Sequence, residues 1–215
     1  MSGRGRGEGN AYDVSVFAVT ATLRPQHAHL MAESSPLWGG ACAMGVPAGW
    51  RDVSELRQVP DNQEAFVSAT DDASLCVELL QRVAAPDEGA MRYLWDDLSE
   101  TNGPGGGAAS GGGGGSSTLQ RCVALPLAAA PGVAGAASLV AIAVGRQLVQ
   151  RKGAEPEETE LHLVLVRLPQ FETDVLFTHQ RGAAGGGGGG EVGECPALMA
   201  AVLAFTIIDE GLFSA

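Results

Sequence analysis

The stretch ELHLVLVRLPQFETDVLFTH, residues 160–179, decides the fold class of this chain. Residues 160–168 are apolar at both odd and even positions, which is typical of a strand that is covered on both faces. The Pro169-Gln170 pair predicts a turn, and residues 173–179 predict a second strand. A short turn joins antiparallel neighbours, so we expect these two strands to pair antiparallel.

Other segments on both sides of this stretch predict further strands and helices. The expected strands are 37–46, which starts at a Gly-Gly kink, 64–69, 74–83, 119–127 and 138–150. Helical spacing of apolar residues predicts a helix over 88–100 with Asp87 as N-cap. Pro196 suits the first turn of a helix over 195–207, and Asp52 suits the N-cap of a short helix over 53–58. We therefore expect an α+β fold, an α/β/α sandwich whose central twisted, largely antiparallel sheet is flanked by helices.

Size and composition predict one domain. The chain has 215 residues, 45% of them hydrophobic, which is enough for a sizeable core. We expect residues 1–36 to be an N-terminal extension, poorly ordered or adding an edge strand, and residues 37–215 to form the domain. The glycine-rich segments 103–117 and 182–190 predict flexible surface loops, because neither carries the lysine of a phosphate-binding loop. No apolar run approaches 18 residues, so we expect no transmembrane helix.

The cysteines and histidines predict neither a metal site nor a bound cofactor. The four cysteines are widely spaced without a Cys-x-x-Cys pair, a pattern that suits a reducing compartment and free thiols. His27 and His29 lie close together, but nothing nearby completes a set of zinc ligands.

The acidic charge of the chain is concentrated in one region. The formal net charge is −12, and residues 52–100 hold twelve acidic side chains against three arginines. Such a surface disfavours nucleic acid and anionic membranes and favours a basic protein partner. The alternative is an acidic surface that only keeps the protein soluble.

The segment LRQVPDNQE, residues 56–64, predicts a rigid turn beside a strand. Pro60 fixes its own φ and holds Val59 extended, and Asp61 and Asn62 stabilise turns through their short side chains. We expect this turn to present Asp61, Gln63 and Glu64 on a rim suited to binding. An ordinary solvated turn is the alternative.

A second acidic group lies at the end of the helix expected over 88–100. Carboxylates of Asp96, Asp97 and Glu100 oppose the helix dipole there, which favours use by a partner over a role in helix stability; a solvated helix end remains the alternative. An acid–base enzyme would need Asp96 or Asp97 beside His162 or His179. No nucleophile motif accompanies them, and we expect the two histidines to be structural.

The amino-acid sequence of the turn resembles that of one known family. RQVPDNQE (57–64), with LWGGA (37–41) and DVSELR (52–57), is similar to the Ran guanine nucleotide release factor family. Residues 75–80, 93–102, 163–175 and IDEGLF (208–213) extend the resemblance. It implies a PsbP-like fold and a regulator without chemistry of its own. Such a regulator binds the basic surface of the GTPase Ran as a monomer, promotes nucleotide release and supports nuclear import in nucleus and cytoplasm. The need for a second Ran-binding protein stays open.

The resemblance also implies a set of partner-binding residues. Asp52, Asp61 and Glu64 match acidic positions of the family directly, Glu78 matches one conservatively, and Gln81 stands where the family carries a glutamate. The expected site comprises Asp52, Asp61, Asn62, Gln63, Glu64, Glu78, Gln81, Asp96 and Asp97, with no catalytic residue. We expect Arg57 to hold the turn by pairing with a neighbouring acid. The alternative functions are a PsbP-like accessory protein of photosystem II and an uncharacterised acid–base enzyme.

Overall fold

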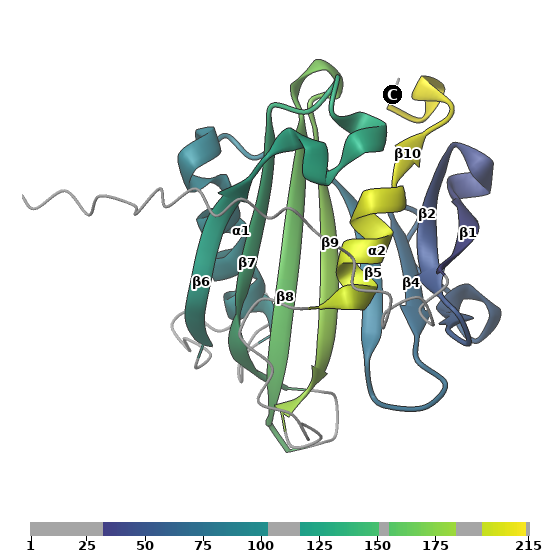
Figure 1. The fold of residues 1–215 in the computed structure, drawn as a ribbon. Helices are drawn as coiled ribbons and strands as arrows, with labels where there is room; N and C mark the ends of the chain where they lie inside the picture. Colours follow the sequence, from purple (N-terminus) through teal and green to yellow (C-terminus); the bar gives the residue numbers. More distant parts are fainter. Residues whose placement is uncertain (1–31, 103–116, 151–154, 184–194, 214–215) are drawn as a thin grey trace, which may run out of the picture.

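The computed structural model describes residues 32–102, 117–150, 155–183 and 195–213. In these residues the main feature is a seven-stranded antiparallel sheet in the order β3-β4-β5-β9-β8-β7-β6 (Figure 1). Its strands are β3 (Arg51–Asp52), β4 (Gln63–Val67), β5 (Ser74–Gln81), β6 (Ser117–Leu125), β7 (Leu139–Val149), β8 (Glu157–Leu168) and β9 (Thr173–Gly182). The two strands predicted from residues 160–179 are β8 and β9, which pair antiparallel as expected.

A second, smaller sheet was not predicted. It consists of β1 (Ala32–Leu37), β2 (Cys42–Pro47) and β10 (Thr206–Ile207) in the order β1-β2-β10. The strand expected over 37–46 is broken by the short turn η2 (Trp38–Gly40), whose three residues all have positive φ. Glycine adopts such angles readily, so the predicted Gly-Gly kink is confirmed.

The predicted division of the chain stays a prediction. β1 runs across the boundary drawn at residue 37. Residues 1–31 and most of the two glycine-rich segments lie outside the described residues.

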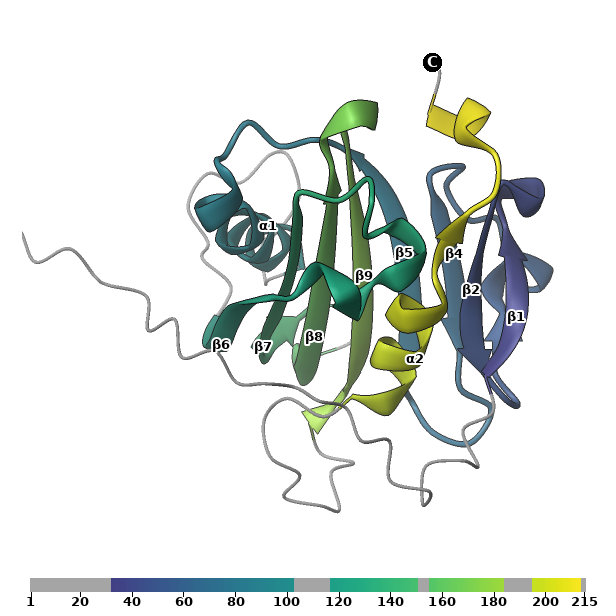
Figure 2. The same cartoon turned by 45° about the horizontal axis from the view of Figure 1, so that its top comes forward.

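One helix covers each face of the large sheet (Figure 2). α1 (Asp87–Asn102) packs on β7 and β6, whereas α2 (Pro196–Ala204) lies between β2 and the large sheet. Both helices were predicted. α2 ends earlier than residue 207 because Thr206 and Ile207 pair with β2 instead. None of the helices in the described ranges is long and apolar enough to cross a membrane.

The hydrophobic core has two parts, separated by the large sheet. Leu163 and Leu165 of β8 face α1, while Val164 and Val166 face α2 and the small sheet. All four side chains are fully buried. This confirms that residues 160–168 form a strand covered on both faces.

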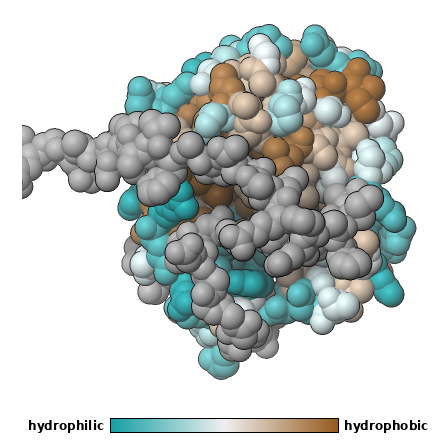
Figure 3. Space-filling model, viewed as in Figure 1, coloured by the Kyte–Doolittle hydropathy of each residue, from teal (hydrophilic) through white to brown (hydrophobic). Residues whose placement is uncertain are grey.

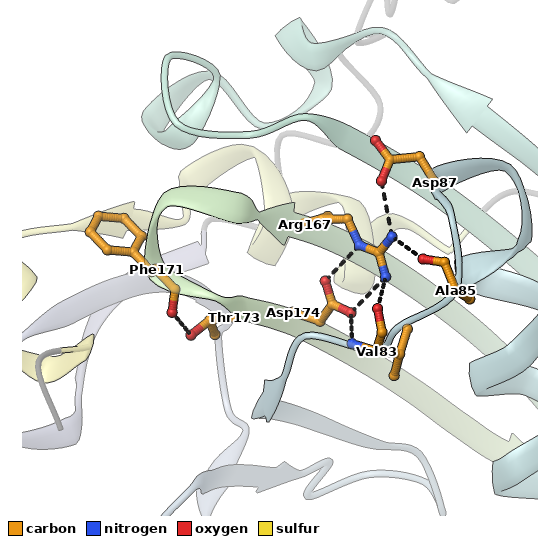
Figure 4. A network of polar contacts seen from close by, with 7 residues as sticks. All are labelled: Val83, Ala85, Asp87, Arg167, Phe171, Thr173 and Asp174. Carbon is orange, nitrogen blue, oxygen red and sulfur yellow. Dashed lines mark hydrogen bonds and ion pairs between the residues drawn. The ribbon is translucent and has the colours of Figure 1, made fainter.

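A buried arginine fastens the start of α1 to the sheet (Figure 4). The Arg167 guanidinium donates two hydrogen bonds to Asp174, at 2.9 and 3.1 Å, and one to Asp87 at 2.9 Å. Its remaining two donors bind the carbonyls of Val83 and Ala85. All five donors are therefore satisfied, and the connection from β5 to α1 is held against β8 and β9.

This network changes the role of Asp87, which was expected to be the N-cap of α1. Asp87 is the first helical residue instead, and its carboxylate binds Arg167. The guanidinium lowers the pKa of Asp87 by its hydrogen bond and charge.

Candidate functional site

The Pro60 turn, residues 60–63, is tied closely to the neighbouring strand. The Gln63 amide donates to the Pro60 carbonyl at 2.9 Å, and Asn62 exchanges hydrogen bonds with the Leu79 backbone at 2.9 and 3.1 Å. Asp61 lies at the tip of the turn, where it is exposed and makes no side-chain hydrogen bond within the described residues. The turn therefore presents one unengaged carboxylate on a fixed backbone.

Glu78 supports the turn from β5. Gln63 and Glu78 are directly opposite each other in the β4–β5 ladder, so their side chains share a face of the sheet. The Glu78 Oε1 accepts hydrogen bonds from Gln63 Nε2 at 2.8 Å and from Asn62 Nδ2 at 3.1 Å. Glu78 is thus half-buried and engaged with the turn's own amides.

Glu64 connects the turn to the small sheet. It is the next residue along β4 and therefore points to the opposite face from Gln63. Its Oε1 accepts a hydrogen bond from the Trp38 backbone amide. Trp38 has a φ of 48° in the η2 turn, so Glu64 holds a backbone conformation that non-glycine residues rarely adopt.

Asp52 lies near the other end of β4. It pairs with Phe66, three residues from Gln63, or about 10 Å along the strand. Its Oδ1 accepts from the Ser54 amide at 2.7 Å, which confirms it as the N-cap of a helix that covers only Val53–Glu55. The prediction that Arg57 pairs with an acid is wrong: Arg57 is exposed and has no ion pair within the ranges that the structure describes.

Of the remaining predicted residues, Gln81 lies near the turn, two residues after Leu79 in β5, whereas Asp96 and Asp97 lie farther away. Gln81 is exposed at the end of β5 and lines a small hollow with Arg82 and Glu172. Asp96 and Asp97 are exposed on α1, which covers β7 and β6. Because β7 is four strand spacings from β4, this places them on the order of 19 Å from the Pro60 turn. Asp96 forms an ion pair with Arg92 one helical turn earlier, at 2.9 Å.

The sheet separates the histidines from the α1 carboxylates. His162 and His179 lie on the face that α2 covers, opposite α1, so the acid–base pairing with Asp96 or Asp97 is not formed. His162 instead contacts Glu160 at 2.8 Å, and the two imidazoles meet edge to face with centroids 5.9 Å apart. Burial lowers the pKa of His179 to about 4, which keeps it neutral at pH 7. Both are buried in strands, as expected of structural histidines.

The cysteines of the described residues are unsuited to chemistry. All four are free, and burial raises the pKa of Cys42 and Cys195 to about 11 and that of Cys76 to about 12. A thiol in this state is a poor nucleophile. Within the same residues no group of three His, Cys, Asp or Glu side chains is arranged to hold a metal ion.

Known proteins share both this fold and this sequence pattern. Residues 35–181 match the model of the family described as Ran-interacting Mog1 protein. This chain belongs to the Mog1 family. A zebrafish Ran guanine nucleotide release factor is 34% identical over 147 residues, which are 67% of this chain and 75% of that protein. The human factor is 35% identical over 145 residues, covering 66% and 72%.

Yeast relatives agree with this assignment. The Saccharomyces cerevisiae nuclear import protein MOG1 is 38% identical over 79 residues, 31% of this chain and 36% of that protein. The crystal structure of the yeast Ran-binding protein Mog1p superimposes with a TM-score of 0.59 at 21% identity, covering 85% of this chain and 98% of that one. A mutant Mog1 structure gives a TM-score of 0.57 with the same coverage and identity. The fold of this chain is therefore the Mog1 fold.

Sequence reasoning missed the contact between Glu64 and η2. Glu64 and Trp38 are 26 positions apart, and no periodic pattern in the sequence links them. The signal that could have pointed there is Gly39-Gly40, because two consecutive glycines mark a left-handed turn whose amides need an acceptor.

Proposed function

We propose that this protein binds the GTPase Ran, promotes the release of its guanine nucleotide and thereby supports nuclear protein import. Membership in a Ran-interacting family, and relatives named release factors and nuclear import proteins, support this function. The observation that carries it is the exposed Asp61 carboxylate on a turn whose Asn62 and Gln63 are hydrogen-bonded to Glu78 and Leu79 of β5.

The residues of the site take different parts in the proposed contact. Asp61 is the central charge, because it is exposed and unengaged. Glu64 directly follows the turn and also holds η2. Asn62, Gln63 and Glu78 keep the turn rigid through their mutual hydrogen bonds. Gln81 lies near the turn at the end of β5, and Asp52 lies about 10 Å along β4 from Gln63. Asp96 and Asp97 steer a basic partner from α1.

The proposed mechanism is competition for the groups that hold the nucleotide. A small GTPase retains its nucleotide through a lysine, a magnesium ion and backbone donors on the phosphates. A carboxylate on a rigid support offers these cationic groups another anion at little entropic cost. If this protein binds nucleotide-free Ran more tightly than nucleotide-bound Ran, it lowers nucleotide affinity by the same factor.

The finer features of this role are also proposals. We propose a regulator that acts as a monomer on a basic surface of Ran, in nucleus and cytoplasm, with no nucleic acid, membrane or cofactor involved. A second Ran-binding protein could complete the complex. We further propose that the fold resembles the PsbP proteins, that residues 1–36 form an extension and that 103–117 and 182–190 are flexible loops.

The direct test is nucleotide release from purified Ran loaded with a fluorescent guanine nucleotide. Adding this protein should accelerate release in proportion to the Ran–protein complex formed. A different small GTPase, loaded in the same way, is the control and should be unaffected. No acceleration with Ran, together with no detectable complex, would overturn the proposed function.

A further inference from the structure

A highly exposed isoleucine follows the last strand of the small sheet. Ile208 is 66% exposed, although it lies directly after β10 (Thr206–Ile207). Single exposed apolar residues are common, so exposure alone assigns no role. The surroundings of Ile208 distinguish it from Tyr93, an exposed apolar residue on α1.

The backbone around Ile208 is fixed at both ends. The amides of Ile208 and Asp209 both donate to the Ala41 carbonyl, at 2.8 and 3.0 Å. Asp209 in turn accepts from the Gly211 amide at 2.8 Å, and Phe213 stacks on Phe171 with ring centroids 4.6 Å apart. The segment that carries Ile208 is therefore an ordered part of the surface, which lowers the entropic cost of using it in binding.

A short series of hydrogen bonds links Ile208 to the proposed binding turn. Ala41, which holds Ile208, donates to the Trp38 carbonyl at 3.3 Å, and the Trp38 amide binds Glu64. Glu64 directly follows the Pro60 turn. Ile208 is thus linked through the backbone to Glu64 at the end of the Pro60 turn, whereas Tyr93, 53% exposed on α1, lies on the other side of the sheet.

The hydropathy of this face agrees with such a position. In Figure 3 apolar residues gather on the upper part of the face, where Figure 1 places β10 and the C-terminal segment. The partly buried Ile207, Leu212 and Phe213 lie beside Ile208 in the chain and pack on the core beneath. Protein interfaces commonly combine an apolar centre with a charged rim.

We propose that Ile208 is the apolar anchor of the Ran-binding surface, with the carboxylates of Asp61 and Glu64 as its charged neighbours. This inference rests on the proposed function and deepens it. The partner it fits is the surface of Ran where an apolar side chain borders basic residues. The basic residues meet Asp61 and Glu64, and the apolar side chain packs on Ile208.

The test compares Ile208→Ser with Tyr93→Ser in the full-length protein, by measuring Ran binding kinetics. Burial of an isoleucine predicts that Ile208→Ser weakens affinity by about tenfold or more, mainly through faster dissociation. Loss of an apolar contact should leave the salt dependence of association unchanged, unlike loss of a charge. Tyr93→Ser should bind as the wild type does. Ile208→Ala serves as a milder second variant, and thermal unfolding verifies that each variant is folded.

The possible outcomes separate this inference from the proposed function. Wild-type affinity for Ile208→Ser and Ile208→Ala, while Asp61→Lys loses binding, would overturn the anchor and leave the function standing. Equal weakening by Tyr93→Ser would also overturn it, as would an Ile208 effect confined to self-association measured by gel filtration. If the wild type itself does not bind Ran, both proposals fail.

Discussion

Two regions of this molecule, the Pro60 turn with its neighbours and the end of α1, each carry several carboxylates but hold them differently. Around the Pro60 turn, Glu64 and Glu78 are half-buried and hydrogen-bonded to the backbone of η2 and to the turn amides. On α1, Asp96, Asp97 and Glu100 are exposed, and the ion pair between Asp96 and Arg92 is itself open to solvent. Exposed pairs of this kind contribute little stability. Glu64 and Glu78 are therefore held in place by hydrogen bonds to η2 and to the turn, whereas the carboxylates on α1 are open to solvent, although both regions are acidic.

The largest expected effect comes from reversing the charge at the tip of the turn. Asp61→Lys should weaken Ran binding by about 100-fold or more, because it places a cation against a basic partner. Stability should change by less than about 0.5 kcal/mol, since Asp61 is exposed and unengaged. Titration by calorimetry and thermal unfolding give the two quantities.

The matched control for Asp61→Lys is Glu100→Lys, an equal change of charge on α1. It should retain affinity within a few-fold. Equal loss of binding in both variants would show that net charge, rather than the Pro60 turn, governs the interaction.

Removing Glu64 should affect folding as well as binding. Glu64→Ala leaves the Trp38 amide without its acceptor, which should cost about 1–3 kcal/mol of unfolding free energy. Glu64→Gln keeps an acceptor oxygen and should recover most of this stability while still losing the charge. Denaturant unfolding distinguishes the two variants, and unchanged stability of Glu64→Ala would remove the proposed link to η2.

Neutralising the α1 carboxylates should change only the rate of association. Asp97→Asn is expected to slow binding to Ran a few-fold at low salt, because the residue lies on the order of 19 Å from the turn and acts through long-range steering. The effect should vanish near physiological ionic strength, where charges this far apart are screened. Stopped-flow measurements at several salt concentrations test this, and a salt-independent effect would place Asp97 in direct contact.

The smallest effect is expected at the end of α1. Glu100→Lys replaces a charge that opposes the helix dipole with one that favours it, which should stabilise the protein by a few tenths of a kcal/mol. A loss of stability, seen in thermal unfolding, would mean that Glu100 has a structural partner beyond those described.

Local patterns account for the parts of the fold that the sequence predicted. The two-sided apolar run of β8, the helical spacing in α1 and the proline at the start of α2 each depend on a few consecutive residues. The small sheet could not be predicted in this way, because two-residue β10 pairs with Cys42 and Ala43 far away in the chain. Asp87 was expected to be the N-cap of α1 for the same reason: local sequence suggests a cap, whereas its actual partner, Arg167, is 80 positions away.

The same limit applies to the candidate site. Pro60, Asp61 and Asn62 predicted the turn because turn chemistry is local. Strand order is decided by tertiary packing, so the sequence grouped Asp96 and Asp97 with a turn that lies four strand spacings away along the sheet. The sequence also predicted an ion pair between Arg57 and a neighbouring acid, which is not formed within the described residues.

The most direct test of the central claim compares two neutral variants in the Ran nucleotide-release assay. Asp61→Asn and Asp97→Asn each remove one exposed carboxylate with little change in shape, one on the Pro60 turn and one on α1. At saturating concentrations of the wild-type protein and each variant, Asp97→Asn should release nucleotide as fast as the wild type does, and Asp61→Asn should lose most of the acceleration. Full activity of Asp61→Asn would contradict the account.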